Sequence, residues 1–97
     1  MLRHIVMFRL EDDAPEGTRE LLAEGLSRLA EGISEISTYS YGADLGLRDG
    51  NFDFAVVADF ESAEAYAGYV NHPDHQAFIR DQLTPVVAER VALQFEF

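Results

Sequence analysis

The sequence predicts one α+β domain whose elements follow the order β-α-β-β-α-β, and three observations support this class. Apolar residues alternate with a period of two in three segments, as they do in strands that face a core, and a further segment is rich in residues that favour extended backbone. Two intervening segments carry helix-start signals, and the first of them repeats leucine at helical spacing. The length of 97 residues suits a single small domain spanning residues 1–97.

The first strand is predicted over Leu2–Leu10. One of its faces carries Leu2, His4, Val6, Phe8 and Leu10. The opposite face carries Arg3, Ile5, Met7 and Arg9. Because both faces hold apolar side chains, both are expected to be covered in the assembled protein.

A helix is predicted to follow this strand. Asp13 and Glu16 have the spacing of a capping box, and Pro15 suits a first helical turn. The helix is expected to end near Gly32. Its apolar stripe consists of Leu22, Leu26, Leu29 and Ile33.

The middle and the end of the chain supply the other three strands. Ile36–Leu45 and Phe52–Phe60 are predicted as strands of a hairpin, joined by turn residues over Gly46–Asn51. The last strand is predicted over Val91–Phe97.

The second helical region is predicted in two pieces. Ser62 can cap a helix over Ala63–Val70. The backbone must break before Pro73, because the residue preceding a proline avoids the helical region. Pro73 then suits the first position of a new helical segment that runs to about Leu83.

This order of elements is that of a ferredoxin-like fold, a four-stranded antiparallel sheet with both helical regions on one face. The second face is predicted to expose Ile5, Met7, Val57 and one or both of Tyr39 and Tyr41. An exposed apolar sheet face is typical of an interface. Two such sheets packed face to face form a two-fold homodimer, which is a dimeric α/β barrel.

Composition narrows the possible partners. The formal net charge is −11, and the chain has 18 acidic residues against seven arginines. Such a charge repels nucleic acid and anionic membranes, so neither is expected as a partner. The absence of cysteine excludes a disulfide framework and thiol catalysis. No apolar run has the length of a signal peptide or membrane span, so a cytoplasmic location is expected.

Several short segments match the pattern of one known family: His4–Leu10, Tyr41–Asp44, Phe60–Ser62, Tyr69–Phe78 and Pro85. With them the chain resembles the stress-responsive dimeric α/β-barrel (Dabb) family over nearly its whole length. The His-Pro-x-His element within residues 69–78 is the most specific of these features.

The resemblance implies a homodimer of ferredoxin-like protomers, a fold shared with small antibiotic-biosynthesis monooxygenases. A few plant members of the family act as polyketide cyclases without a cofactor, using a tyrosine and a histidine of this same element. Carried over to this chain, the tyrosine matches Tyr69 and the histidine matches His75. The strand histidine beside the cyclase pocket matches His4.

The residues themselves support a chemical role for His75. A helix that begins at Pro73 places His75 in its first turn, where the helix dipole favours a neutral imidazole, although Asp74 acts in the opposite direction. A neutral histidine beside a positioned tyrosine can remove a proton next to a carbonyl group. The alternative is structural: His75 holds the helix break together, and Tyr69 packs in the core with its hydroxyl bonded.

A small apolar pocket is predicted between the helices and the sheet. Its walls are expected to be Val6, Phe8, Phe54 and Val56, with Tyr69 and His75 as catalytic groups and His4 and His72 as further ligand-binding groups. Each of these two histidines also has a structural interpretation. His4 would be a core histidine whose ring is hydrogen-bonded, and His72 would cap or pack at the helix break.

No cofactor and no transition-metal site are predicted. His72 and His75 have a spacing that could suit a metal, but the intervening proline at a helix start directs the two rings apart. Nothing in the sequence indicates ligands for a hard cation such as magnesium, and that possibility stays open.

The leading functional hypothesis is a homodimer that binds a small apolar or phenolic compound. It would act as a cofactor-independent enzyme, cyclase- or lyase-like or monooxygenase-like, on a phenolic or polyketide-like carbonyl compound, with His75 as base and Tyr69 as its partner. The alternative is a non-catalytic, stress-associated structural or ligand-binding dimer in which His4, Tyr69 and His75 are structural. A third reading is an interaction protein that uses its acidic surface.

Overall fold

A computed structural model describes all 97 residues, and its elements follow the predicted order. The strands are β1 (Leu2–Leu10), β2 (Thr38–Ala43), β3 (Phe54–Phe60) and β4 (Val87–Glu96). The helices are α1 (Thr18–Gly32), α2 (Ala63–Val70) and α3 (Pro73–Phe78). A π-helical turn, η1 (Ile79–Leu83), continues α3.

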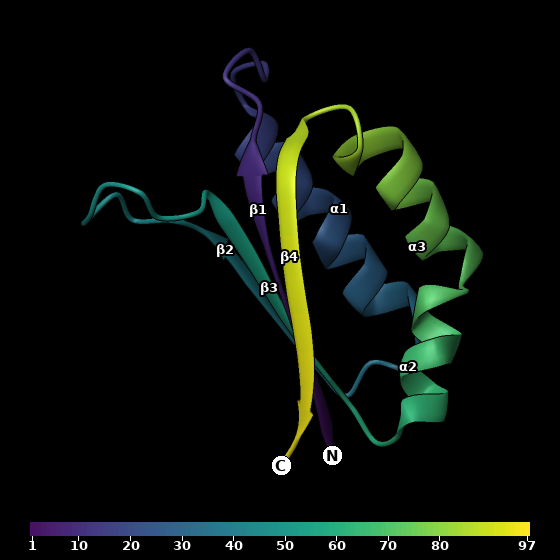
Figure 1. Cartoon of the computed structure of the whole chain (residues 1–97). Coiled ribbons are helices and arrows are strands. Elements are labelled where there is room, and N and C mark those ends of the chain that lie inside the picture. Colours follow the sequence, from purple (N-terminus) through teal and green to yellow (C-terminus); the bar gives the residue numbers. More distant parts are fainter.

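The four strands form one antiparallel sheet in the order β2-β3-β1-β4 (Figure 1). Strand β1 lies between β3 and β4, and its residue His4 is opposite Ala58 on one side and Gln94 on the other. The next residue, Ile5, is opposite Leu93 of β4 and points to the other face. The predicted ferredoxin-like fold is therefore confirmed.

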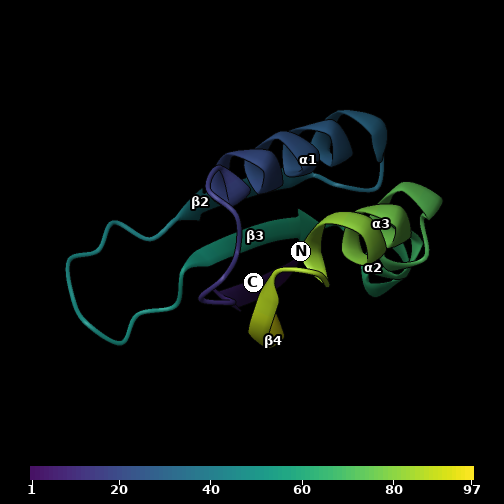
Figure 2. The ribbon, with the colours of Figure 1, turned by 90° about the horizontal axis from the view of Figure 1, so that it is seen from above.

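All the helices cover the same face of the sheet, as the two ribbon views show (Figures 1 and 2). Between the layers lies a core of 14 buried apolar side chains, which includes the predicted stripe of α1. These residues are Val6, Phe8, Leu10, Leu22, Leu26, Leu29, Ile33, Phe54, Val56, Ala58, Phe60, Tyr69, Phe78 and Leu83. The opposite face carries Met7 and is uncovered within the protomer.

The predicted capping box at the start of α1 is wrong. The residue before the helix is Gly17, whose φ of 84° is in the left-handed region, and no side chain caps the first turn. Instead, the Thr18 hydroxyl donates a hydrogen bond of 2.6 Å to the Pro15 carbonyl. This bond closes a turn after Pro15, so the helix begins at Thr18, beyond the reach of Asp13.

The strand boundaries also differ from the predicted ones. Strands β2 and β3 are shorter than predicted, because the hairpin connection between them takes up residues 44–53. Strand β4 begins four residues earlier than predicted, at Val87, because Val87 pairs with Leu10 of β1. The register shifts between Arg9 and Leu10, a β-bulge that no periodicity in the sequence reveals.

Tyr39 and Tyr41 do not lie on the uncovered face, contrary to the possibility left open by the sequence. They pair with Ala58 and Val56 of β3, which are core residues, and both tyrosines pack against the core. The reason is register: a shift of one residue exchanges the two faces of a strand, and only the pairing with β3 decides between them.

The break in the second helical region is confirmed. The Ser62 hydroxyl accepts a hydrogen bond of 3.1 Å from the Ala65 amide, and α2 ends at Val70. Helix α3 begins at Pro73, as predicted. The following segment is not a continuation of α3 in α-helical form: the Thr84 amide bonds to the Ile79 carbonyl at 2.8 Å, an i to i−5 bond that defines the π turn.

The packing of α1 against α3 depends on a close approach at Gly25. A Cβ atom built on Gly25 would lie 2.6 Å from Cε1 of Phe78 and 2.6 Å from Oε1 of Gln82. Phe78 is a buried core residue, so its ring has little freedom to move. Gly25 is therefore required by packing rather than by backbone conformation.

We expect Gly25→Ala to destabilise the protein by about 1–3 kcal/mol, because overpacking a close helix contact displaces core side chains. Urea unfolding followed by circular dichroism measures this change. Gly32→Ala is the matched control, since its Cβ would lie 3.7 Å from Asp74 Oδ2, an ordinary contact. Equal stability of the two variants would show that the α1–α3 approach does not need Gly25.

Candidate functional site

A cavity of about 110 Å³ lies between the helices and the sheet. Every element of the protomer contributes to its wall, so the cavity depends on the whole tertiary structure. It is lined by His4, Val6, Phe8, Leu26, Tyr39, Val56, Tyr66, Tyr69, Val70, His75, Phe78, Ile79, Leu83 and Arg90. Most of this lining is apolar or aromatic, with a few polar groups that converge on it, as in small-molecule sites.

The helix break places Tyr69 and His75 against each other. Tyr69 is near the end of α2 and His75 is in the first turn of α3, and their ring centroids are 4.2 Å apart at an interplanar angle of 51°. The hydroxyl groups of Tyr69 and Tyr39 are 2.7 Å apart and share one hydrogen bond. Burial raises the pKa of Tyr69 to about 12, and burial also raises the pKa of Tyr39 far above its ordinary value.

His75 is the group in this cavity with an unused polar atom. Its Nδ1 is buried and has no hydrogen-bond partner. Burial lowers the pKa of His75, the positive charge of Arg90 and the ring of His72 lower it further, and the backbone of Val70 partly opposes the shift. His75 is thus neutral at pH 7 and retains basic capacity, as a general base requires.

His4 is held by a neighbouring strand. It is only 5% exposed, and its Nδ1 lies 2.8 Å from the side-chain nitrogen of Gln94 on β4. An amide nitrogen is a donor, so His4 accepts at Nδ1 and carries its proton on Nε2. Its ring also packs on Tyr66, with centroids 5.1 Å apart. Burial, followed by the charges of Arg90 and His75, lowers the pKa of His4 to about 4.

Six of the residues expected at the site line this one cavity: His4, Val6, Phe8, Val56, Tyr69 and His75. Phe54 does not, because it is buried in the core nearer the hairpin. His72 also lies outside the cavity lining. Its Nδ1 accepts a hydrogen bond of 3.1 Å from the Asp74 amide and so caps α3.

The sequence did not point to Tyr39, Tyr66 or Arg90, and all three line the cavity. Tyr39 and Arg90 are directed inward by the strand pairings of β2 and β4, and those pairings leave no local sign in the sequence. Tyr66 could have been found, because it stands three residues before Tyr69 on the same predicted helix face.

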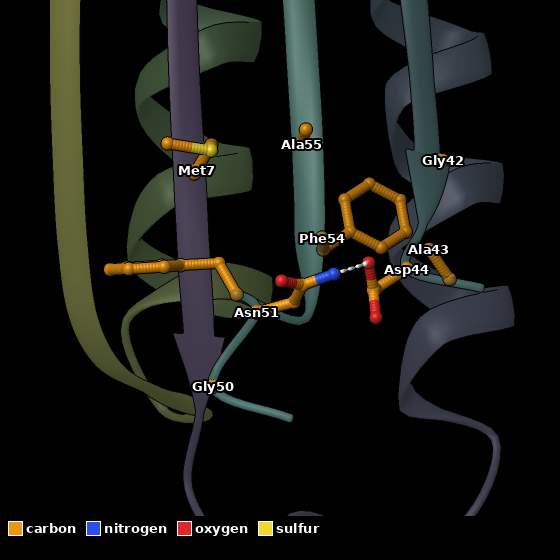
Figure 3. A pocket seen from close by; sticks show the side chains of 9 residues that line it. Met7, Gly42, Ala43, Asp44, Gly50, Asn51, Phe54 and Ala55 are labelled. Atoms are coloured by element: carbon orange, nitrogen blue, oxygen red, sulfur yellow. Dashed lines mark hydrogen bonds between the residues drawn. The ribbon is translucent and has the colours of Figure 1, made fainter. Parts of the chain in front are cut away.

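A second, more open hollow lies on the uncovered sheet face beside the hairpin (Figure 3). Met7 of β1, Ala55 of β3 and Gly42 of β2 form its floor, and Asp44 and Asn51 stand at its rim. Asn51 donates a hydrogen bond of 3.2 Å to Asp44, which ties the two ends of the hairpin connection together. The hollow has a volume of about 470 Å³ and no histidine or tyrosine, so it lacks acid–base groups near neutral pH.

Two further features bear on partners. No group of three or more histidine, aspartate or glutamate side chains is arranged to hold a metal ion. None of the helices has the length and apolar character needed to cross a membrane.

The sheet order, the helices on one face and the enclosed cavity define a ferredoxin-like protomer of the α/β-barrel class. The sequence model of the Stress responsive A/B Barrel Domain (Dabb) matches residues 2–97, so the chain belongs to that family. The resemblance inferred from the sequence is confirmed.

Known relatives agree with this assignment. The uncharacterized protein SCO4036 of Streptomyces coelicolor is 30% identical over 94 residues, which cover 92% of this chain and 97% of that protein. A dimeric ferredoxin-like protein of unknown function from Thermobifida fusca is 43% identical, with a TM-score of 0.91 over 99% of this chain and 90% of that one. The hydroxynitrile lyase of Passiflora edulis is 21% identical, with a TM-score of 0.83 over 97% and 90% of the two chains, and that likeness concerns the fold alone.

Lowering the pH from about 7 to about 4.5 is expected to destabilise the protein through His4. The unfolded chain takes up the imidazole proton near the ordinary pKa of 6.5, whereas folded His4 takes it up near pH 4. The stability that His4 contributes is therefore complete above about pH 6.5 and is lost as the pH falls toward 4. The unfolding free energy falls by about 2 kcal/mol at most, because the His4 ring borders a cavity and is less completely desolvated than a ring in a packed core.

Urea unfolding of His4→Gln at both pH values measures this contribution, since glutamine does not titrate and can still bond Gln94. The difference in unfolding free energy between the two pH values should shrink in the variant. His72→Gln removes a histidine outside the cavity and should keep the full loss. An unchanged pH dependence in His4→Gln would exclude His4 as its source.

Proposed function

We propose that the protein is a homodimer that binds a small, flat, partly apolar carbonyl or phenolic compound in the cavity of each protomer. We further propose that it transfers a proton, with His75 as base and Tyr69 as its partner. The observation that carries this proposal is the unpartnered, buried Nδ1 of His75 beside a cavity and 4.2 Å, ring to ring, from Tyr69.

An unpaired buried nitrogen is costly, because the folded chain loses the hydrogen bond that water would supply. A purely structural histidine in a core normally has a partner at each ring nitrogen that is buried. A ligand with a weakly acidic C–H or O–H group would supply the missing partner at Nδ1. This cost supports a ligand-facing role for His75 over a structural one.

Tyr69 complements this base. The hydrogen bond between the two tyrosines can run from Tyr39 to Tyr69, which leaves the Tyr69 hydroxyl hydrogen free to point at a ligand oxygen. As His75 removes a proton next to a carbonyl group, negative charge grows on the carbonyl oxygen, and a hydroxyl donor there lowers its energy. The raised pKa of Tyr69 keeps that donor protonated at neutral pH.

The size of the cavity limits what can enter. An engineered cavity of about 150 Å³ holds one benzene molecule. The cavity of about 110 Å³ is smaller than this, so it encloses the reacting end of a compound and not the whole of a larger one such as an extended polyketide chain. A surface depression of about 480 Å³ shares Val70, His75 and Ile79 with the cavity, and it can hold the rest of a longer ligand.

The second candidate is a non-catalytic binding protein that uses the same cavity. The bond between His4 and Gln94 and the bond between Tyr39 and Tyr69 would hold the core in either case. The Passiflora hydroxynitrile lyase demonstrates that the fold can carry an enzyme.

Deuterium exchange separates catalysis from binding. In D₂O, the wild-type protein should accelerate exchange of the methyl protons of 4-hydroxyacetophenone, which lie next to a carbonyl, as measured by proton NMR. His75→Ala should abolish the acceleration, and Tyr69→Phe should reduce it by about 10²-fold, the usual range for loss of one acid–base or oxyanion group.

His72→Ala is the matched control, because it removes a histidine that caps α3 outside the cavity. It should lower stability and leave exchange intact. Binding of the probe without accelerated exchange would favour the non-catalytic candidate. A protein that neither binds nor exchanges any of a panel of small phenolic ketones would refute both.

We also propose that the homodimer forms through the uncovered sheet face. Its apolar side chains come from β1, β3 and β4, and several are substantially exposed in the protomer: Met7, Val91, Leu93, Phe95 and Phe97. The Thermobifida relative, at 43% identity, is described as dimeric. A second copy of the same face is the occupant that these observations support, because two twisted sheets of the same hand stack readily.

Leu93→Glu should convert the dimer to a monomer, because it places a charge beside Ile5 on an apolar face that must lose its water on association. Sedimentation equilibrium at micromolar concentration measures the change. Leu21→Glu, on the exposed side of α1, makes the same substitution away from the sheet and should remain dimeric. A monomeric wild-type protein would overturn this assembly.

A further inference from the structure

The cavity has an unusual balance of charge for this chain. The protein carries 18 acidic residues, yet none of the 14 residues that line the cavity is aspartate or glutamate. His4 and His75 are neutral at pH 7, since burial lowers both pKa values. Arg90 is therefore the one charged group in the lining.

Arg90 is directed to the cavity by strand pairing. It is opposite Phe8 of β1, a buried core residue, so its side chain leaves β4 on the helix side of the sheet. Arg90 is also an exposed residue, so its guanidinium lies at the edge of the cavity rather than deep inside it.

Arg90 also lacks the carboxylate partner that most arginines of this chain have. Five of the other six arginines form ion pairs within 4.0 Å: Arg3, Arg9, Arg19, Arg28 and Arg80. The sixth, Arg48, lies in the exposed hairpin connection and is not part of the cavity lining. The chain has a net charge of −11, yet this guanidinium has no carboxylate partner, so it is available to bind an anionic group of a ligand.

The charge of Arg90 reaches the groups inside. It contributes to the lowered pKa values of His4 and His75, and it partly offsets the rise that burial causes in the pKa of Tyr69. Arg90 lines the same cavity as these three side chains, so its charge acts on the polar part of that cavity. A negative charge on a ligand held there would be attracted by the same charge.

We propose that the natural ligand carries a carboxylate group and that Arg90 is the residue that selects for it. This inference rests on the proposed function, because it uses the same cavity. A guanidinium binds a carboxylate through two parallel hydrogen bonds, which fixes the orientation of a flat acid. A phosphate group would need several donors, and the cavity offers one cation.

The contact between Arg90 and the ligand carboxylate orients the ligand for the proposed chemistry. With its carboxylate on Arg90 at the cavity edge, a compact aromatic or keto acid extends its apolar part toward Val6 and Val56. Its reactive hydrogen then lies near the rings of Tyr69 and His75. The ligand class is thus a small phenolic or keto carboxylic acid rather than a neutral phenol or ketone.

A matched pair of probes tests the assignment: 4-hydroxybenzoate and 4-hydroxybenzyl alcohol, which have the same ring and differ in charge. Binding to the full chain is followed by chemical-shift changes in ¹H–¹⁵N NMR spectra. We expect the acid to bind about tenfold more tightly than the alcohol, the effect of one well-formed charge-assisted pair. Arg90→Gln should remove this preference and leave binding of the alcohol unchanged.

Arg48→Gln is the matched control, since it makes the same change of charge on the hairpin connection and should keep the preference. Titration of the histidine rings provides a readout without ligand: the pKa values of His4 and His75 should rise in Arg90→Gln and stay constant in Arg48→Gln.

The outcomes distinguish the two proposals. If the alcohol binds and the acid binds no more tightly, or if Arg90→Gln keeps the preference, the carboxylate assignment is overturned and the proposed cavity stands. If neither probe perturbs residues of the cavity, the proposed function fails and the carboxylate assignment fails with it.

Discussion

The antiparallel register of β1 between β3 and β4 is the constraint on which the rest of the structure depends. It directs His4 toward the helices, opposite Ala58 and Gln94, and directs Ile5 to the uncovered face, opposite Leu93. The cavity and the proposed dimer surface thus lie on opposite faces of β1. A slip of one residue would exchange them and place a histidine in the interface and apolar side chains in the site.

A second constraint is the break between α2 and α3. In a continuous helix, residues six apart are separated by about 9 Å along the axis and about 120° around it, so Tyr69 and His75 could not touch. Pro73 removes the continuity, and His72 caps the new helix start. The chain turns there, and the two rings come within 4.2 Å of each other, centroid to centroid. The chemistry proposed for the cavity follows from this interruption.

Burial gives the cavity its electrostatic character. It disfavours charged forms, so His4 and His75 are neutral and Tyr69 is protonated, which is the combination needed for a base and a hydrogen-bond donor at neutral pH. The charge of Arg90, at the exposed edge, reinforces the neutral state of both imidazoles. The unpartnered Nδ1 of His75 is the cost of this arrangement to stability, and it falls on the group that the proposed reaction requires.

The sequence alone determined the order of elements, the ferredoxin-like class, the family, the Pro73 helix start and the inward face of β1, because periodicity, capping and proline act locally. It therefore placed His4, Tyr69 and His75 near one another. It misassigned the start of α1 and the start of β4, and it left the faces of Tyr39 and Tyr41 undecided. Those features depend on a turn closed by Thr18 and on strand register, as does the inward direction of Arg90. Register is a choice between pairings that are nearly equivalent locally, and only burial of the whole sheet against the helices decides it.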